Sequence, residues 1–278
     1  MKADDAAYLA RMLRRRCGIV LGPSKLKLIE NRLAPVMRRF GFREASAMIA
    51  ELRFGRDALA RAVTEALTTN ESSFFRDLEV FARFRDKVLP QLVTRRAAAK
   101  RLRIWSAACA AGQEAYSIAM ILDDLELAAR GWNVDLIATD ISAEMIARAE
   151  QGLYTPFELQ RGLPAELPIA HFSPHGRHWR VNENLRRMVT FRTFNLLDSF
   201  GWLEDVDVVF CRNVLMYLDA RTKMDVLGKI AEVIQPDGYL VLGQLESAKG
   251  LSDAFEPLVD MPGMYAPAAA AIPRAANG

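Results

Sequence analysis

Apolar positions in the first quarter of the chain recur every three or four residues, which is the period of amphipathic helices. This spacing predicts one helix from Leu26 to Phe40 and another from Asp57 to Leu67. Pro35 lies inside the first pattern, so that helix is expected either to bend or to restart there. Residues 1–67 therefore predict a small helical domain.

The period changes after residue 100. Helical spacing continues from Phe75 to Leu92, and residues 68–100 are predicted to be a linker and connecting helix. Beyond it, apolar runs alternate with helical patterns: the runs lie at 102–109, 133–140, 207–213 and 238–246, and helices are expected at 113–122, 142–152 and 220–234. Pro236, Asp237 and Gly238 are expected to close the last helix. This alternation predicts a parallel sheet with right-handed crossovers.

One stretch, 154–190, does not fit the alternation. Its two short, partly alternating runs predict an antiparallel β-subdomain inserted into the sheet domain, which spans 101–267. Residues 268–278 are small and interrupted by proline, and are expected to be a tail. The predicted fold class is α/β, with a helical N-terminal domain and a parallel-sheet domain that carries the insertion.

Composition adds a sizeable core and an uneven charge. Hydrophobic residues make up 51% of the 278 positions, and no apolar run is long enough to span a membrane. We found no secretory signal, so a cytoplasmic location without membrane insertion is expected. Residues 1–75 hold 14 basic and 8 acidic residues, a net charge of +6. This favours an anionic partner, either nucleic acid, lipid or an acidic protein, or is only a solvated helical face.

A metal site is not expected. Cys17, Cys109 and Cys211 lie far apart without a CxxC pair, so we interpret them as reduced thiols in the core. His171, His175 and His178 have a spacing that could hold a metal, but they lie in an expected hairpin loop without a nearby cysteine. Solvated loop histidines are the favoured interpretation.

Polar side chains follow the predicted strands. Ligands of open parallel sheets bind at the carboxyl ends of the strands, so these side chains are the first candidates for a site. The first strand leads through a small-residue turn at Gly112 to Glu114, and the second ends in Asp140. A carboxylate at that second position accepts bonds from ribose hydroxyls in nucleotide-binding sheets, although Asp140 or Ser142 could equally start the next helix.

The later strands end in Asn195 and in Arg212 and Asn213. An arginine that emerges from a buried strand requires a partner for its charge, which favours a functional role for Arg212.

Several motifs occur together in a fixed order: TTNESSFFR at 68–76, WSAACAAGQEAYSIA, ATDIS, NLLD and FCRNVLMYLD. In combination they resemble the chemotaxis receptor methyltransferases, which methylate glutamate side chains of chemoreceptors with S-adenosylmethionine. The resemblance covers about residues 10 to 265. It implies a helical N-terminal domain and a Rossmann-like methyltransferase domain with an antiparallel β-subdomain.

The resemblance also implies a set of site residues. The family's cofactor contacts fall on Asn70, Ser72, Arg76, Glu114, Asp140, Asn195, Leu196, Arg212 and Asn213. Arg76 and Tyr217 would lie nearest the reacting methyl group. The two phenylalanines of TTNESSFFR would anchor that segment in the core.

The partner is also implied by the resemblance. Lys25, Arg32 and Arg39 fall seven residues apart and form a basic stripe, which would meet the acidic methylation helices of the receptor. The short turn HFSPHGRHW resembles the type that does not bind the receptor's C-terminal pentapeptide. Two alternatives stay open: a methyltransferase acting on RNA, and a non-catalytic module that binds the cofactor or the receptor. RNA binding would normally bring exposed aromatic residues among the basic ones, so no nucleic acid partner is expected.

Overall fold

The computed structural model describes residues 1–22, 26–163 and 170–268, and the chain forms two compact units. A helical unit comprises Met1–Thr69 and Tyr217–Thr222, and a sheet unit comprises the rest of the chain from Asn70 onward. Lys25 and the predicted tail beyond residue 268 lie outside the described residues. No described helix is long and apolar enough to cross a membrane.

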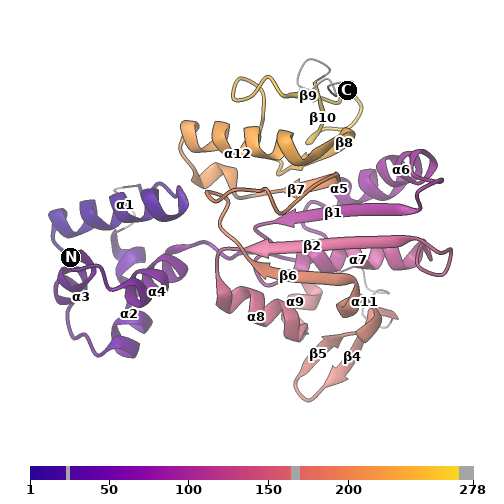
Figure 1. Ribbon diagram of the computed structural model, residues 1–278. Coiled ribbons are helices and arrows are strands. Elements are labelled where there is room, and N and C mark those ends of the chain that lie inside the picture. The colour runs from indigo at the N-terminus through magenta and orange to yellow at the C-terminus, as the bar shows by residue number, and fades with distance from the viewer. Residues whose placement is uncertain (23–25, 164–169, 269–278) are drawn as a thin grey trace. The chain divides into compact units, whose positions relative to one another are not determined.

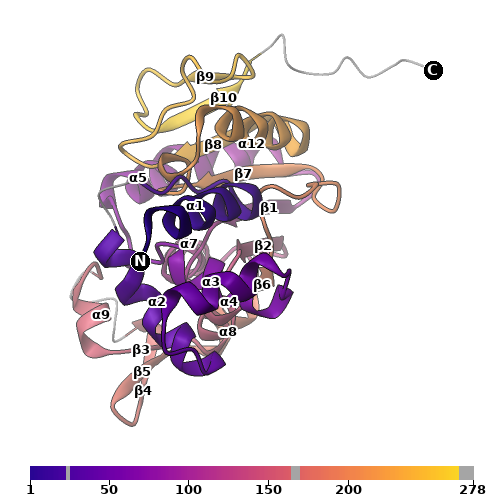
Figure 2. The same ribbon diagram turned by 90° about the vertical axis from the view of Figure 1, so that its left-hand side faces the viewer.

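The described part of the helical unit contains α1 (Ala3–Cys17), α2 (Leu26–Phe40), α3 (Ala45–Arg53) and α4 (Asp57–Leu67), shown in Figure 2. Their fully buried side chains form the core of the unit: Leu9, Leu13, Leu33, Met48, Ile49, Leu59 and Val63. The bounds of α2 and α4 agree with the prediction. α2 is one continuous helix through Pro35, whose ring is exposed.

A short segment from later in the sequence completes the helical unit. Gly18 ends α1 in a left-handed conformation, with its N–H bonded to the carbonyl of Arg14. The chain then runs beside the segment Tyr217–Thr222: the N–H of Val20 donates to the carbonyl of Tyr217 at 2.9 Å, and Ile19 pairs with Leu218 in an antiparallel bridge. Tyr217, the last residue of the 3₁₀ turn η3 (Leu215–Tyr217), is therefore held by backbone bonds.

The sheet unit is built on seven strands in the order β6-β2-β1-β7-β8-β10-β9. The first five are parallel: β6 (Val189–Thr193), β2 (Asn133–Asp140), β1 (Arg101–Ala107), β7 (Val206–Cys211) and β8 (Ile234–Leu242). β10 (Met264–Pro267) and β9 (Phe255–Pro257) continue the sheet antiparallel. The arrowheads of β1, β2 and β6 in Figure 1 show that parallel strands deliver their carboxyl ends to one edge.

The predicted strands differ from the observed ones mainly at their ends. β2 spans the predicted residues, whereas β1 ends at Ala107, two residues early. The prediction that Pro236 to Gly238 close the preceding helix was wrong, since these residues lie inside β8, which starts directly after α12 (Ala220–Val233). A register irregularity between Val206 and Val208 of β7 accompanies this part of β8, where proline has no N–H to donate.

The inserted antiparallel sheet has the strand order β3-β5-β4, with β3 (Leu153–Tyr154), β4 (Phe172–His175) and β5 (His178–Val181). His175 pairs with His178, so two residues connect β4 to β5. α8 (Ala143–Gln151) leads into this sheet, and α9 (Pro156–Gln160) and α11 (Glu183–Met188) belong to the insertion. His171 is buried, with Nε2 3.5 Å from Asp124, so the prediction of a solvated loop histidine was wrong there.

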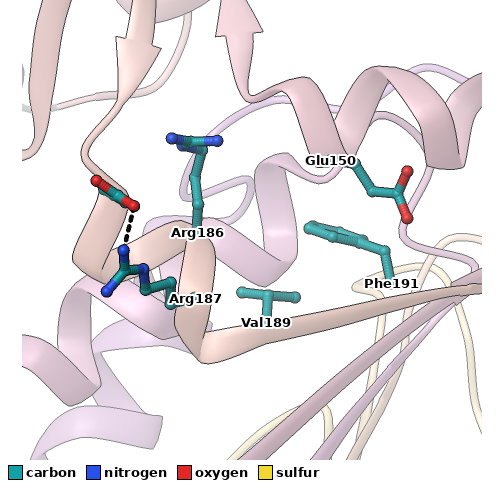
Figure 3. A pocket seen from close by; sticks show the side chains of 6 residues that line it. Glu150, Arg186, Arg187, Val189 and Phe191 are labelled. Atoms are coloured by element: carbon teal, nitrogen blue, oxygen red, sulfur yellow. Dashed lines mark hydrogen bonds and ion pairs between the residues drawn. The ribbon is translucent and has the colours of Figure 1, made fainter.

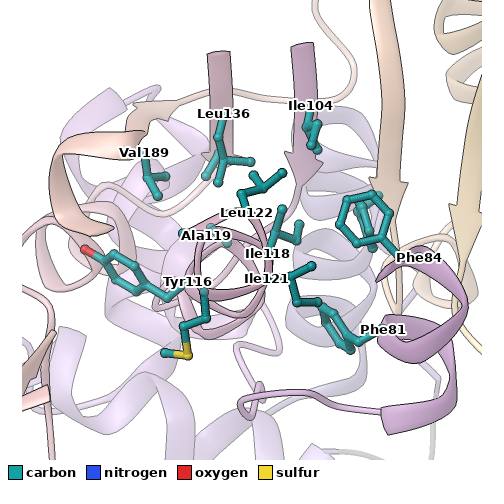
Figure 4. Close-up of a cluster of buried hydrophobic side chains, with 14 of the residues drawn as sticks. Phe81, Phe84, Ile104, Tyr116, Ile118, Ala119, Ile121, Leu122, Leu136 and Val189 are labelled. Atoms are coloured by element: carbon teal, nitrogen blue, oxygen red, sulfur yellow. The ribbon is translucent and has the colours of Figure 1, made fainter. Parts of the chain in front are cut away.

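Helices cover the sheet and bury its apolar side chains. α5 (Leu78–Arg83), the π-helical turn η2 (Phe84–Val88) and α6 (Leu89–Arg95) follow one another and pack with α7 (Gln113–Asp124) against the sheet. Figure 4 shows Phe81 and Phe84 converging with residues of α7 on Ile104 of β1 and Leu136 of β2. The segment from α5 to α6 therefore contributes buried side chains to the core of the sheet unit, among them Val80, Phe81, Phe84 and Val88.

Candidate functional site

Arg212 directly follows β7 and is the centre of a hydrogen-bond network at the carboxyl edge of the sheet. Its side chain is only 1% exposed. Nη2 donates to Asp77 Oδ2 at 2.7 Å and to the carbonyl of Arg76 at 2.8 Å, and Nη1 donates to Glu114 Oε2 at 2.9 Å. The charge of Arg212 thus meets two protein carboxylates. Asp77, one of them, was missed by the sequence analysis because nothing in its local pattern distinguishes it.

Glu114 lies in the first turn of α7 and is the second carboxylate on Arg212. Ser106 Oγ, from β1, also donates to Glu114 Oε1 at 2.8 Å. Burial raises the pKa of the Glu114 carboxyl, while the nearby Arg212 charge and these hydrogen bonds act in the opposite direction. The residue is therefore a largely buried carboxylate, with 12% of its side chain exposed, beside the turn at which β1 ends.

The TTNESSFFR segment is anchored by its two phenylalanines. Phe74 is fully buried, and its ring lies 4.8 Å from that of Tyr154 in an edge-to-face arrangement. The backbone N–H of Phe75 donates to Ser117 Oγ of α7 at 2.9 Å. The two aromatic side chains lie in the core, as expected, and Arg76 stays half-buried, donating from Nη1 to the carbonyl of Glu71 at 3.1 Å.

Asp140, at the end of β2, ties neighbouring strand ends together. Its Oδ2 accepts from the N–H of Ala110 in the turn after β1, and its Oδ1 accepts from the N–H of Ser142, both at 2.9 Å. Ser142 is the N-cap of α8. The carbonyl of Asp140 accepts from Phe194, beside Asn195, whose Oδ1 accepts from the N–H of Leu197.

Asn213 is held by Glu246, a residue that sequence reasoning missed. Glu246 Oε2 accepts from the backbone N–H of Asn213 at 2.6 Å and of Gly243 at 2.9 Å, and Oε1 accepts from the N–H of Met216 at 3.1 Å. One carboxylate thus fixes the turn that follows β7 to the turn that follows β8. Its position just beyond an apolar run was the signal that could have identified it.

The backbone at this edge adopts strained conformations. Five non-glycine residues here have a positive φ: Phe75, Asp77, Ala108, Ala110 and Asn213. Such conformations cost of order 1–3 kcal/mol each and occur preferentially at functional sites. Gly112, with φ +89°, adds a close approach, since a Cβ on it would lie 2.8 Å from that of Ala149. Tight turns of this kind bring backbone near a ligand.

These features fit a polar, positively charged ligand. Within the described residues, two buried polar side-chain atoms at this edge lack a hydrogen-bond partner, Gln113 Oε1 and Arg212 Nε. Glu114 and Asp77 share the guanidinium of Arg212, and Asp140 supplies a further carboxylate at this edge. A cofactor with cationic groups and ribose hydroxyls matches this donor and acceptor set.

Other predicted residues are less clearly placed. Asn70, Ser72 and Leu196 are half-buried, and the polar side chains of Asn70 and Ser72 have no hydrogen-bond partner in the part of the chain that the structure describes. Tyr217 belongs to the helical unit. In that unit, Arg32 Nη1 donates to the carbonyls of Leu67 and Thr68 at the end of α4, whereas Arg39 is exposed.

A separate hollow of about 220 Å³ lies beside α8, α11 and β6. Figure 3 shows it lined by Glu150, Arg186, Arg187, Val189 and Phe191, with an ion pair between Arg187 and Glu183. None of the predicted cofactor contacts lines it. Among residues 1–22, 26–163 and 170–268, no group of three His, Cys, Asp or Glu side chains could hold a metal ion, and the three cysteines are free and buried.

The helical unit, the parallel sheet ending in an antiparallel pair and the polar strand-end site define the class I methyltransferases that use S-adenosylmethionine. Residues 70–262 match the model of the CheR methyltransferase SAM-binding domain, and residues 4–68 match the all-alpha domain of the same family. The chain belongs to the CheR methyltransferase family, and its cofactor is S-adenosylmethionine.

Known relatives cover nearly the whole chain. The chemotaxis protein methyltransferase Cher2 of Pseudomonas putida is 38% identical over 257 residues, which is 91% of this chain and 93% of the relative. The chemotaxis protein methyltransferase of Vibrio parahaemolyticus is 40% identical over 268 residues, or 94% of this chain and 96% of the relative. Chemotaxis protein methyltransferase 1 of Pseudomonas aeruginosa is 39% identical over 256 residues, 91% and 93% of the two chains.

Proposed function

We propose that this protein transfers a methyl group from S-adenosylmethionine to glutamate side-chain carboxylates of chemoreceptors, giving glutamate methyl esters. The family supports a methyltransferase of the chemotaxis system. The observation that carries the proposal is the network around Arg212, which fixes the TTNESSFFR segment to the strand ends where a class I cofactor site lies.

The reaction requires little from the protein. When bound, the cofactor supplies a sulfonium methyl group; a carboxylate oxygen forms the new C–O bond as the C–S bond breaks, and the sulfur keeps the electron pair. No proton is transferred, because a glutamate carboxylate is already ionised at neutral pH. The chain's task is to orient the two reactants and to exclude water.

The proposed contacts divide into positions that touch the cofactor and positions that orient the carboxylate. Asn70, Ser72, Glu114, Asp140, Asn195, Leu196, Arg212 and Asn213 are the proposed cofactor contacts, following the resemblance. Arg76 and Tyr217 are proposed to orient the incoming carboxylate through a guanidinium and a hydroxyl. Support for the first group is the position of two carboxylates at the carboxyl edge: Asp140 is buried, and the Glu114 side chain is 12% exposed.

The basic stripe of Lys25, Arg32 and Arg39 is proposed to contact the receptor. Arg32 also binds the carbonyl groups at the end of α4, so a substitution there would disturb the helix end as well. Arg39 is the cleaner probe because it is exposed. Arg39→Glu should raise the KM for receptor and leave cofactor affinity unchanged; an equal loss of cofactor affinity would mean that the fold is damaged.

We further propose that the enzyme acts in the cytoplasm without a pentapeptide tether. The two-residue connection between β4 and β5 supports the absence of a tether, since it leaves no long loop at that hairpin. Calorimetry with a receptor C-terminal pentapeptide should detect no strong binding, and micromolar affinity would contradict the proposal. The division into a helical domain at 1–67, a linker and connecting helix at 68–100 and a methyltransferase domain at 101–267 stays a proposal.

The decisive experiment uses labelled S-adenosylmethionine, the purified protein and membranes that contain chemoreceptors. We expect label on a receptor-sized band that mild base releases as methanol, which identifies a carboxyl methyl ester. Base-stable label, or label in RNA, would still identify a methyltransferase but would exclude receptor glutamate as its substrate. Cofactor binding without transfer would favour a module that signals by binding.

A further inference from the structure

The helical unit carries a groove of about 600 Å³ that the cofactor chemistry does not use. It lies between the exposed face of α1 and the segment Tyr217–Thr222, both within this unit. Its lining includes Tyr8, Arg11, Arg14, Arg15, Asp219 and Arg221. We call this surface the arginine groove. Neither Arg32 nor Arg39 of the basic stripe lines it.

The arginine groove has an unbalanced positive charge. Arg14 pairs with Asp219, with Nε 2.7 Å from Oδ2. Arg11, Arg15 and Arg221 are exposed, and no ion pair or hydrogen bond joins their guanidinium groups to another residue in the described ranges. Three like charges that share a concave surface raise its positive potential and attract an anionic partner.

The groove is better suited to carboxylates than to a nucleotide base. Its one aromatic ring, that of Tyr8, is covered by the guanidinium of Arg53 at 4.7 Å, and the Tyr8 hydroxyl donates to the carbonyl of Leu52 at 2.9 Å. A base would need a free aromatic face for stacking. The remaining donors are guanidinium groups, whose planar geometry matches carboxylates in bidentate pairs.

The groove is also joined to the segment that carries Tyr217. Asp219 and Arg221 lie two and four residues beyond Tyr217, and the Tyr217 carbonyl accepts from Val20 just after α1. Asp219 Oδ1 further accepts from the N–H of Thr222 at the start of α12, so the segment is fixed on both sides. A partner held by Arg221 is therefore held on the same short, anchored segment as the proposed orienting tyrosine.

From these observations we infer that the arginine groove docks an acidic segment of the methyl-accepting protein, with carboxylates next to the target glutamate paired to Arg11, Arg15 and Arg221. This inference rests on the proposed function, which makes the substrate a glutamate-bearing protein. The groove is a second receptor surface, in addition to the basic stripe. It contributes to binding of the protein substrate and not to binding of the cofactor.

The test reverses the three unpaired charges in the full-length protein. The variant Arg11→Glu/Arg15→Glu/Arg221→Glu leaves the Arg14–Asp219 pair intact, and Arg43→Glu is the control, since Arg43 is an exposed arginine of the same unit outside the groove. Co-sedimentation with chemoreceptor-containing membranes measures affinity without requiring methyl transfer. We expect the triple variant to bind about tenfold more weakly and Arg43→Glu to bind within about twofold of wild type.

The outcomes are separable. Equal binding of the triple variant and wild type, or no binding of wild type to receptor membranes, overturns the inference. Equal binding to receptor-free anionic vesicles would assign the groove to lipid, and loss of binding after ribonuclease treatment would assign it to RNA; either result also overturns it. If receptor binding depends on the groove but no methyl ester forms, the inference about the groove stands and the proposed function is rejected.

Folding of the variants is checked independently. Cofactor affinity, measured by calorimetry, should be the same for wild type and the triple variant, because the groove lies outside the cofactor site. A second variant, Arg11→Gln/Arg15→Gln/Arg221→Gln, removes the charges without introducing acidic ones. It should also lose receptor affinity, by a smaller factor than the charge reversal; if only the glutamate variant loses affinity, the arginines make no attractive contact and the inference fails.

Discussion

Arg212 and Asp77 lie 135 residues apart in the sequence and form an ion pair of 2.7 Å in which the Arg212 side chain is 1% exposed. The pair fastens the end of the TTNESSFFR segment to the end of a central strand. Because Arg212 also binds Glu114 and the carbonyl of Arg76, one side chain holds three separate parts of the sheet unit together.

Arg212→Lys should lose most of the hydrogen bonds that Arg212 makes. A lysine has one charged group where arginine has a planar fork, so it cannot serve Asp77, Glu114 and the Arg76 carbonyl in the same geometry. Breaking a buried pair costs about 3–5 kcal/mol. We expect a lower melting temperature and at least roughly tenfold weaker cofactor binding by calorimetry. The exposed Arg187→Lys is the control, and equal behaviour of the two variants would contradict the assignment.

Glu246→Gln should impair turnover. The carboxylate accepts three backbone N–H groups, from Asn213, Gly243 and Met216. A glutamine has one carbonyl oxygen and brings an NH₂ group to a site made only of donors. The turn that carries Asn213 would then shift, and kcat should fall about tenfold or more. Glu256→Gln, on the exposed part of β9, should leave kcat unchanged; equal kcat values for both variants would reject the positioning role.

Gly112→Ala should destabilise the protein more than Gly250→Ala. Both glycines have a positive φ, +89° and +75°, so both substitutions carry a similar conformational cost. Only at Gly112 would the new methyl group meet other atoms, 2.8 Å from Ala149 Cβ. Chemical denaturation should show an additional loss of about 1–3 kcal/mol for Gly112→Ala. Similar losses in the two variants would show that the turn adapts.

Cofactor affinity should depend on pH through Glu114. Burial raises the pKa of this carboxyl, so it takes up a proton at a pH where an ordinary glutamate is still ionised. Protonation removes the negative charge that attracts the cationic cofactor, and affinity should therefore fall as pH decreases toward the raised pKa. Calorimetry between about pH 8 and 5 measures this fall. Glu114→Gln should bind weakly at all these pH values; a pH dependence equal to that of wild type would exclude Glu114 as its source.

Arg76→Ala and Tyr217→Phe should reduce turnover with little change in stability. The Arg76 side chain is half-buried and, within the described ranges, donates only to the Glu71 carbonyl, so its removal leaves the Arg212 network in place. Loss of an orienting contact with a charged group is worth about 1.5–3 kcal/mol, or roughly ten- to hundredfold in rate. Initial rates of receptor methylation provide the measurement. Wild-type turnover in both variants would reject the proposed orienting roles.

The helices and strands of this fold could be predicted because the spacing of apolar residues along the sequence indicates which face of each element is buried. α2 and α4 have the predicted bounds, and so does β2. The entry into β8 was not predictable from the same signal, because Pro236 and Gly238 resemble a helix end and only pairing with β7 makes them part of a strand. The π-helical turn of Phe84–Val88 likewise falls within an ordinary helical spacing.

The sequence predicted which chain segments form the candidate site, but it did not predict the contacts between their side chains. Strand ends and the TTNESSFFR motif marked where polar groups would gather. Asp77 escaped notice because its importance comes from Arg212, 135 residues away, and sequence spacing carries no record of such a contact. Glu246 stands just beyond an apolar run, but its bond to Asn213, 33 residues away, becomes visible only in the fold. Arg212 was correctly expected to need a partner, and its contacts in the structure are two protein carboxylates and a carbonyl.

The three buried cysteines give this protein built-in reporters of local opening. Burial raises the pKa of Cys17 in the helical unit and of Cys109 and Cys211 in the sheet unit, so all three thiols are protected from alkylating reagents while their surroundings stay closed. Each thiol becomes reactive only when its own unit opens. Comparing the alkylation rate of Cys17 with those of Cys109 and Cys211 therefore shows whether the two units unfold separately or together. Different rates indicate separate unfolding, and equal rates indicate a single transition.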